Sequence, residues 1–316
     1  MPLMILRRCG LFFLTLFLSS LIIFVITQYL PGDPARIMLG REAGEAALQQ
    51  LRAELGLNLS LPLQFWQWTT NLLQGNWGIS YSTKTEIFPL VMLRLRNSFV
   101  LTLFTLLMAV PLGVGLGIIA GLQENKGIDL LISLFALSVV GLPEFVSGTL
   151  LIELFSFRLH LFPANSSISP QANLLQVIPQ LVLPALTETL VLLAYFARLT
   201  RAGILAELHL PYVRSARLKG LPYAVVIVKH VLRNALLPLI TVVAMSFGWL
   251  IGGLVVTENV FNYPGLGRLL VFAIERRDLP LMQAVSIITV SGFALANLIA
   301  DMSYMWLNPK VRFMGK

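Results

Sequence analysis

The 316-residue sequence has one cysteine, three histidines and few charged residues, and each shortage excludes a class of protein. Cys9 alone cannot form an internal disulfide, and His160, His209 and His230 are too scattered to suggest a metal site. Charged residues make up 12% of the chain, about half the fraction usual in soluble domains. The phosphate-binding motif G-x-x-x-x-G-K-[ST] is missing, so the chain is not expected to hydrolyse ATP alone. No Ser/His/Asp or Cys/His arrangement supports a membrane hydrolase.

Apolar residues are abundant instead, at 57% of the chain, and the mean hydropathy is +0.81. Because a membrane-spanning helix needs about 20 apolar residues, we predict an all-α integral membrane protein. Its six transmembrane helices are expected within 9–30, 97–121, 129–157, 180–198, 236–258 and 281–307. The third run is too long for one straight crossing, and dividing it at Gly141–Pro143 leaves halves that are too short. We therefore predict one broken or tilted helix there.

The first apolar run follows Arg7 and Arg8, as a signal peptide's would, but it is longer than a cleaved signal's apolar core. We therefore predict a retained first span. Six crossings put both termini on one side, and the Lys and Arg residues of the short loops favour the cytoplasm for that side. The expected organisation is a first helix in 1–30, an extracytoplasmic segment in 31–96, a five-helix core in 97–307 with a cytoplasmic loop at 199–235, and a cytoplasmic tail in 308–316.

The net charge of +8 does not indicate nucleic-acid binding, because no basic tail or aromatic-basic interleaving is present. One basic stretch without acids, YVRSARLKGLPYAVVIVKHVLRNALLP, runs from Tyr212 to Pro238. It could be an anchor that touches lipid headgroups. Alternatively, it is a docking helix for a cytoplasmic partner: Ala216 and Gly220 would lie one turn apart on a small-residue face that lets another surface approach closely.

The segment RSARLKG followed by NALLPLI resembles the cytoplasmic loop of bacterial ABC-importer permeases, where Glu-Ala-Ala…Gly precedes Ile-x-Leu-Pro. Ala216 and Gly220 match that motif, whereas Arg214 and Ser215 replace its first two positions. The later Leu237–Pro238 pair resembles the dipeptide, oligopeptide and nickel branch in particular. Further stretches of the chain resemble the same branch. They are LPGDPAR (30–36), LGLNLSLPLQFWQW (55–68), GNWGISY (75–81), ARLTRAGILAEL (197–208), ENVFNYPGLGRLL (258–270), RDLP (277–280) and NLIADMSYMWLNPKVR (297–312).

The resemblance implies a transmembrane permease subunit of the bacterial inner (cytoplasmic) membrane. It implies a coupling helix that docks into a separate ATPase and transmits its closure to the spans. By analogy, the coupling residues are Tyr212, Val213, Arg214, Ser215, Ala216, Lys219, Gly220 and Leu221. The chain would bind no cofactor, because ATP and Mg belong to the ATPase. The implied partners are a second related permease, two ATPase subunits or domains, an extracytoplasmic solute-binding protein and membrane lipid, but no nucleic acid.

The resemblance leaves the cargo open between short peptides, the favoured class, and nickel or a metal chelate. Two other kinds of protein compete with the importer. A secondary transporter working alone would often show inverted repeats and paired broken helices, and we find one broken span and no convincing repeat. A membrane scaffold for a soluble enzyme would explain the basic loop alone.

The segment 31–96 has a helical pattern at 42–55 and a second, interfacial pattern at 62–68. Trp66, Trp68 and Trp77 are placed as an aromatic belt would be. Contact with a solute-binding protein is the alternative for the segment as a whole.

Small residues at four-residue spacing let membrane helices approach closely. They are Gly113, Gly117 and Gly121 in the second span and Gly248 and Gly252 in the fifth, for which we predict helix packing. A direct role in transport is the alternative, and the interface with the second permease is a further place where these glycines would pack.

Intramembrane acids indicate function more strongly, because a charge at a helix centre costs about 2.5–3.5 kcal/mol. Glu144 and Glu188 fall at comparable depth in the outer half. They would line a path for a positively charged solute, or each is neutralised by protonation or by a neighbouring subunit. Glu153 is expected in solvent at the outer interface. Asp301, with Asn297 one turn before it, is expected to form structural hydrogen bonds.

Overall fold

In the computed structural model, residues 2–29, 33–40, 42–167 and 174–307 are described, and the predicted tail at 308–316 lies outside them. The described chain is helical, and its extended backbone pairs at one isolated bridge, between Ile79 and Glu86. Within the described residues, four helices are long and apolar enough to cross a membrane, and two bent helix pairs raise that number to six if each pair is one span. The all-α class is therefore confirmed, with four to six candidate spans.

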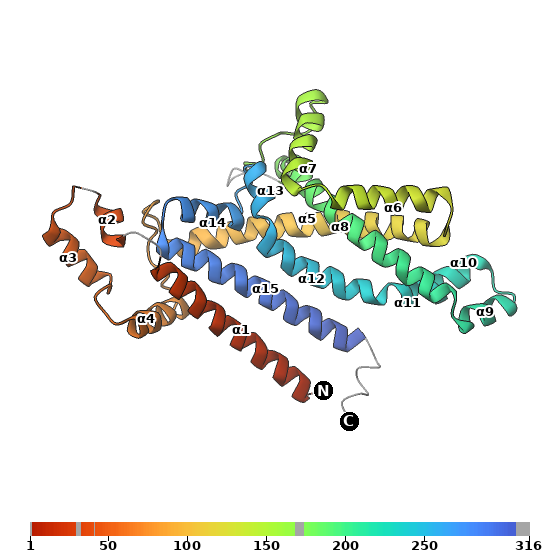
Figure 1. Ribbon diagram of the computed structural model, residues 1–316, viewed down its shortest axis with the longest axis horizontal. Coiled ribbons are helices and arrows are strands. Elements are labelled where there is room, and N and C mark those ends of the chain that lie inside the picture. Colours follow the sequence, from red (N-terminus) through yellow and green to blue (C-terminus); the bar gives the residue numbers. More distant parts are fainter. Residues whose placement is uncertain (1, 30–32, 41, 168–173, 308–316) are drawn as a thin grey trace.

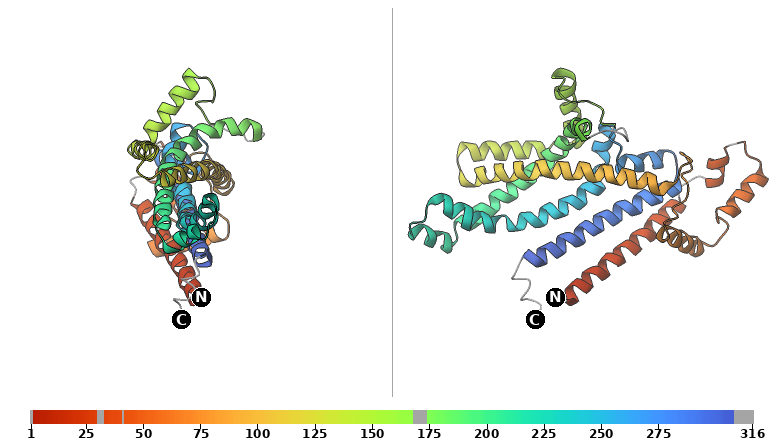
Figure 2. Two further views of the ribbon diagram at one scale, coloured as in Figure 1. Left: turned by 90° about the vertical axis from the view of Figure 1, so that its right-hand side faces the viewer. Right: turned by 180° about the vertical axis from the view of Figure 1, so that it is seen from behind.

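The long helices run side by side and form the body of the molecule (Figures 1 and 2). They are α1 (Pro2–Gln28), α5 (Ile87–Leu122), α8 (Leu174–Leu208), α12 (Leu237–Gly253) and α15 (Leu279–Leu307). The main core lies between α5, α8 and α12, around buried residues such as Leu101, Phe196 and Leu250. The start of α1 and the end of α15 lie toward the end of the bundle that carries α9 (Pro211–Leu218), and α2–α4 lie at the opposite end (Figure 1).

Two predicted spans have different bounds in the structure. Helix α5 begins at Ile87 rather than at residue 97, and α8 extends from Leu174 to Leu208 rather than over 180–198. The start of α5 was predicted too late because Arg94 and Arg96 end the apolar run, whereas charged residues do not end a helix. At 36 residues, α5 is longer than the roughly 20 residues that the hydrocarbon requires, so one or both of its ends extend beyond it.

The third predicted span breaks where expected, but the two halves diverge strongly. Helix α6 (Gly127–Val140) and the segment formed by α7 (Glu144–Leu151) and a π-helix (Ile152–Arg158) are bent by 106° at the break. Figure 1 shows α7 leaving the bundle sideways. A bend of 106° agrees with the broken alternative of the prediction and not with the tilted one. Pro143 interrupts the helix, and α7 packs instead on α13 (Val255–Val260): a Cβ on Gly148 would lie 3.3 Å from Val260 and Phe261.

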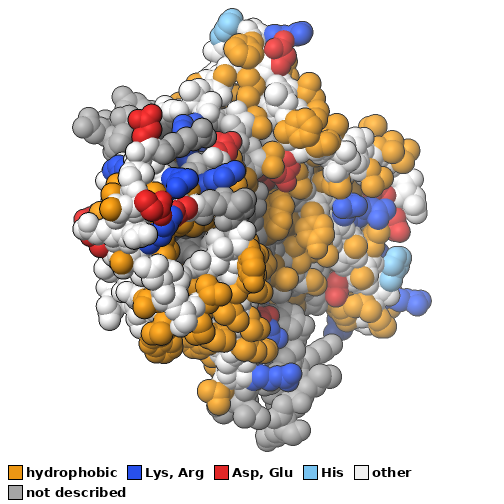
Figure 3. Space-filling view, turned by 60° about the vertical axis from the view of Figure 1, so that its left-hand side comes forward, with side chains coloured by type: hydrophobic (Ala, Val, Ile, Leu, Met, Phe, Trp, Pro, Cys, Tyr) orange, Lys and Arg blue, Asp and Glu red, His pale blue; other side chains and the backbone are white. Residues whose placement is uncertain are grey.

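The segment after α1 forms α2 (Pro34–Leu39), α3 (Glu45–Glu54) and α4 (Leu61–Leu73), the last longer than the predicted 62–68. Asp33 accepts a hydrogen bond from Ala35 N at 3.1 Å and so caps α2. The same carboxylate binds Arg52 of α3 at 2.6 Å. Seen from this end, acidic and basic side chains gather beside a broad hydrophobic surface (Figure 3). This segment is therefore a folded unit rather than a simple loop.

The tryptophans of this segment do not share one environment. Trp66 is 68% exposed, as a belt residue would be. Trp68 packs on Phe24 of α1, with 6.0 Å between ring centroids, and Trp77 contacts Phe88 edge to face at 5.0 Å. Two of the three therefore hold the segment against α1 and α5.

The remaining helices complete the body. They are α10 (Tyr223–Val225), the π-helix Val226–Leu232, α11 (Arg233–Ala235) and α14 (Leu266–Glu275). The stretch Tyr223–Ala235 meets α12 at a 47° bend. Arg8 forms an ion pair with Asp301, which joins the start of α1 to the end of α15. Glu153 is exposed and pairs with Arg158 at 3.0 Å.

Candidate functional site

Helix α9 has one buried and one exposed face. Pro211 at its first position has a backbone already suited to a helix start, and His209 and Leu210 are the whole connection to α8. Val213 and Ala216 are 0% and 7% exposed. They pack into a cluster whose other buried members are Ile204, Val226, Ile227, Val231 and Ala235. Helix α9 is therefore seated on the end of α8 and on the helical turns that follow α9.

The opposite side of α9 and its following turn faces outward. Leu218 is 80% exposed, Leu221 is 39% exposed and Tyr223 is 56% exposed. Arg217 lies over the Tyr223 ring at 5.5 Å. We name as the α9 surface the exposed residues Arg214, Arg217, Leu218, Lys219, Leu221 and Tyr223. An apolar centre with a basic rim is the composition of a protein-binding surface.

The structure corrects the predicted small-residue face. The helix ends at Leu218, so Ala216 and Gly220 do not share a helical face. Ala216 packs inward, and Gly220 has φ +76° with nothing within 4 Å of an added Cβ. Gly220 N donates to Arg217 O at 3.0 Å and Leu221 N donates to Ala216 O at 3.4 Å, closing the end of the helix. The left-handed backbone at residue 220 therefore favours glycine.

Tyr212 connects α9 to its neighbours. Its hydroxyl donates to the Glu207 carboxylate at the end of α8 and lies 3.2 Å from His230 O. Asn234 Nδ2 donates to the same hydroxyl at 3.1 Å. Burial, and next the hydrogen bond with Glu207, raise the pKa of Tyr212, so the hydroxyl keeps its proton at neutral pH. Tyr212 therefore links α9 to the end of α8 and to α11.

The predicted coupling residues thus divide by position. Val213 and Ala216 face inward, Tyr212 bridges, and the exposed members are Arg214, Ser215, Lys219, Gly220 and Leu221. Sequence reasoning missed Arg217, Leu218 and Tyr223 as members of the exposed surface. An apolar Leu218 between Arg217 and Lys219 was the available signal, because a solvated basic stretch has no need for it.

Helices α5 and α8 touch at the glycines of α5. A Cβ on Gly113 would lie 2.7 Å from Phe196 Cβ, and one on Gly121 would lie 3.0 Å from Ile204. A Cβ on Gly117 would lie 2.5 Å from Thr200 Cβ and 2.6 Å from the Ala197 carbonyl oxygen. The distances at Gly113 and Gly117 are shorter than real contacts, so these two glycines are needed for the observed approach, whereas the distance at Gly121 is a tight contact. The sequence did not single out Gly203 of α8, whose Cβ would lie 2.6 Å from Ala235 O.

The glycines of α12 are less alike. A Cβ on Gly248 would lie 2.8 Å from Ala296 Cβ of α15, whereas one on Gly252 would meet Thr289 at an ordinary 3.6 Å. Gly248 therefore sets the α12–α15 distance, and Gly252 does not.

The predicted intramembrane acids lie near each other. Glu188 of α8 is 1% exposed, accepts a hydrogen bond from Thr257 Oγ1, and is close enough to Glu144 and Glu258 for their charges to interact. Glu144 is half-buried at the start of α7. Among the described residues, no group of three or more His, Cys, Asp or Glu is placed to hold a metal ion. In this conformation Glu188 contacts other helices rather than an open channel.

Glu258 of α13 is the acid that sequence reasoning missed. It is fully buried, and its carboxylate accepts hydrogen bonds from Ser98 of α5 and from Arg268 N of α14, the latter at 3.0 Å. A Cβ on Gly265 would lie 1.9 Å from its Oε1. Glu258 thus joins three helices, and an acid before the glycine-rich stretch NYPGLG was the available signal.

A second missed pair joins α6 to α8. Arg201 Nε donates to Asp129 Oδ1 at 2.6 Å and its Nη2 donates to Oδ2 at 2.7 Å. The Asp129 side chain is 6% exposed and that of Arg201 is 30% exposed. Bidentate geometry and burial make this a strong ion pair.

We expect Asp129→Asn and Arg201→Gln each to destabilise the protein, because each leaves a largely buried group without its partner. In a double-mutant cycle followed by thermal unfolding in detergent, the two changes should couple by about 0.5–3 kcal/mol. The Arg158–Glu153 pair is the matched control: its side chains are 72% and 53% exposed, so its coupling should be smaller. Equal coupling in the two cycles would contradict this interpretation.

Comparisons with known proteins match both the N-terminal and the C-terminal part of the chain to family models. Residues 113–313 match the family model "Binding-protein-dependent transport system inner membrane component", and residues 1–102 match the N-terminal model of the same system. The chain is 39% identical over 299 residues to a glutathione transport system permease protein GsiC of Pectobacterium atrosepticum, and 38% identical to that of Escherichia coli K12. Each alignment covers 95% of both chains. A crystal structure of an amino acid ABC transporter with histidines covers 71% of this chain and 94% of its own, at 19% identity and a TM-score of 0.49.

Proposed function

Because this chain belongs to the binding-protein-dependent inner-membrane components, the permease subunits of ABC importers in the peptide and nickel family, we propose that it forms the path for short peptides. An extracytoplasmic binding protein would deliver them. The main observation in support of this proposal is the similarity, over 95% of both chains, to permeases named for glutathione transport. Glutathione is a peptide-like solute, so this likeness favours peptides over nickel as cargo.

The proposed topology has six spans in the bacterial inner membrane, with both termini in the cytoplasm. Support comes from the common end at which the start of α1, the end of α15 and α9 lie (Figure 1) and from the basic residues gathered there. On this topology α2–α4 are extracytoplasmic and can meet the binding protein. The α7 segment lies at 106° to α6 and would not complete a membrane crossing in the observed orientation. The α6–α7 unit therefore departs most from a regular transmembrane helix.

The proposed energy source is ATP hydrolysis on separate subunits, which would hold ATP and Mg. The α9 surface is suited to dock into such a subunit, because Leu218 at its centre is 80% exposed and its rim is basic. Tyr212 and the Val213–Ala216 contacts would carry the displacement into α8. A second related permease would complete the path.

The acids Glu144 and Glu188 are proposed to contribute to that path only after a rearrangement, because Glu188 is enclosed here. Their shared neighbourhood with Glu258 would favour a cationic group, such as a peptide amino group.

Reconstitution tests the proposed function. We expect proteoliposomes that contain this chain, the partner permease, both ATPases and the binding protein to accumulate a short peptide when ATP is supplied. Omitting this chain or either ATPase should reduce uptake to the protein-free background. Gradient-driven uptake by this chain alone would contradict the proposal and support a secondary transporter.

A further inference from the structure

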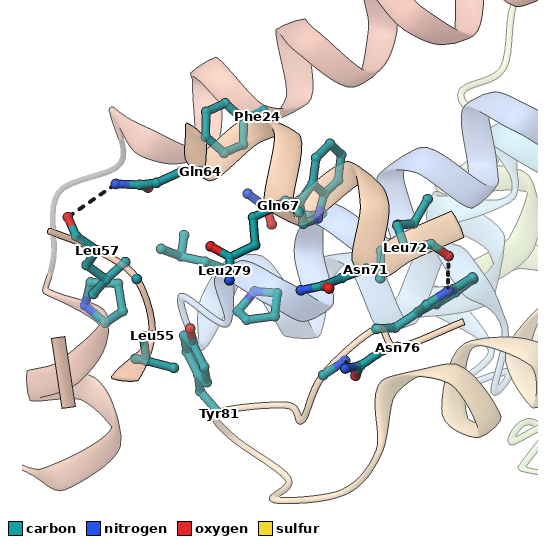
Figure 4. Close-up of a pocket in the computed structure, with 18 of the residues that line it drawn as sticks. Phe24, Leu55, Leu57, Gln64, Gln67, Asn71, Leu72, Asn76, Tyr81 and Leu279 are labelled. Carbon is teal, nitrogen blue, oxygen red and sulfur yellow. Dashed lines mark hydrogen bonds between the residues drawn. The ribbon is translucent and has the colours of Figure 1, made fainter. Parts of the chain in front are cut away.

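A pocket with a cavity volume of about 330 Å³ lies between the extracytoplasmic segment and the outer ends of α1 and α15 (Figure 4). Its walls come from the end of α3 and the turn after it, one face of α4, the stretch 76–81 and the start of α15. This volume is at the lower end of the range for small-ligand sites, about 300–1,000 Å³.

The pocket is rich in side-chain amides. Its six carboxamides are those of Gln28, Gln64, Gln67, Asn71, Asn76 and Gln283. Several are already engaged: Gln28 Nε2 donates to Gln64 Oε1 at 2.9 Å, and Gln283 Nε2 donates to Thr27 at 2.7 Å. These hydrogen bonds join residues of the pocket wall to one another and hold the wall in place. The polar groups that face the centre of the pocket are different ones.

Three polar side chains point into the centre and lack partners. Gln67 and Asn71 lie one turn apart on α4 and are directed into the pocket, opposite the Tyr81 hydroxyl (Figure 4). Their side-chain polar atoms form no hydrogen bond within the described part of the chain. Burial raises the pKa of Tyr81 to about 12, with Asp278 contributing, so its hydroxyl is a donor at neutral pH.

The charge of the pocket narrows what could occupy it. Among the described lining residues there is no Lys, Arg or His, and Glu54 is the one acid. A free peptide would bring a carboxylate that finds no cation here. An internal polypeptide segment has no such terminus, and each peptide group offers one donor and one acceptor. A carboxamide pairs with both.

We propose that this pocket receives an extended, uncharged segment of the extracytoplasmic binding protein, whose peptide groups bind Gln67, Asn71 and Tyr81. This inference rests on the proposed importer function, and it adds where on this chain the binding protein is held. The wall is preorganised, because Arg52 binds both Asp33 at 2.6 Å and Glu45 at 2.9 Å and so ties α2 to α3. Preorganisation lowers the entropic cost of binding.

The first test removes the hydrogen bonds without emptying the pocket. In the full complex in nanodiscs, we expect Gln67→Leu with Asn71→Leu to raise the binding-protein concentration that gives half-maximal ATPase stimulation by about tenfold. Basal ATPase activity should stay unchanged. Gln74→Leu is the matched control, because Gln74 is exposed at the end of α4, does not line the pocket, and should leave the titration unchanged.

An unchanged half-maximal concentration in the double variant would overturn the inference while the importer function stands. Wild-type complex that shows no stimulation by the binding protein would instead refute the proposed function, so the two failures are distinguishable.

The second test identifies the occupant. A photoreactive residue at Asn76, which lines the pocket but is not one of the three proposed binding residues, should cross-link the liganded binding protein upon illumination. Mass spectrometry should place the cross-link in an internal segment without charged side chains. A cross-link to the cargo peptide, a lipid, a saccharide or the second permease, or none at all, would overturn the inference.

Discussion

Replacing Leu218 with aspartate is expected to release the ATPase subunits while leaving the permease folded and inserted. The Leu218 side chain is 80% exposed and so contributes little to the fold of this chain. It lies at the centre of the α9 surface, between the exposed Arg217 and Lys219. If that surface is docked, the leucine is buried in the complex. Placing a carboxylate there would then add the cost of desolvating a charge to the loss of apolar contact.

The expected magnitude follows from the apolar contact alone. Burying a leucine side chain contributes about 1.5–3 kcal/mol, which corresponds to at least a tenfold weaker association. Copurification of the ATPase with the permease should fall accordingly, and ATP-dependent uptake with it. Leu73→Asp is the matched control, because Leu73 is 79% exposed at the opposite end of the molecule and should retain the ATPase. Undiminished copurification of Leu218→Asp would remove the α9 surface from the coupling mechanism.

A single methyl group at Gly117 is expected to separate α5 from α8. The added Cβ of Gly117→Ala would lie 2.6 Å from the Ala197 carbonyl oxygen, a backbone atom that cannot move without shifting α8. Overpacking of this kind costs about 1–3 kcal/mol. We therefore expect a lower midpoint of thermal unfolding in detergent. Because α8 leads directly to α9, coupling between ATP hydrolysis and uptake should also weaken.

Gly115→Ala is the control for that experiment. Gly115 lies in the same helix and has nothing within 4 Å of an added Cβ. Alanine stabilises a helix interior relative to glycine by about 0.5–1 kcal/mol, so this variant should be unchanged or more stable. Equal losses in the two variants would show that the α5–α8 approach does not depend on a missing side chain at residue 117.

The all-helical membrane class followed from the sequence because it depends on composition and on the length of apolar runs. A hydrocarbon solvent requires each span to satisfy its own backbone hydrogen bonds, and that requirement acts locally. The break at Gly141–Pro143 was predictable for the same reason, since proline lacks a backbone donor. The family motifs, including Ala216 and Gly220, could likewise be recognised from the sequence alone.

Helix ends and the direction of the α7 segment were not predictable in this way. Helix α5 continues through Arg94 and Arg96, because a helix can leave the apolar region without ending. The 106° turn before α7 is consistent with the contact of Gly148 with Val260 and Phe261, residues more than a hundred positions away. Such contacts leave no periodic signal in a single sequence.

The sequence by itself determined that this chain is a helical membrane permease and which basic stretch is proposed to meet a partner, because hydrophobicity and motifs are properties of neighbouring residues. Only the tertiary structure decided the roles of individual side chains: Ala216 inward, Leu218 outward, Gly220 for its backbone, Asp129 with Arg201, and Glu258 with Ser98. These depend on which distant segments meet. Burial and ion pairing arise only when the chain has folded, so no local pattern encodes them.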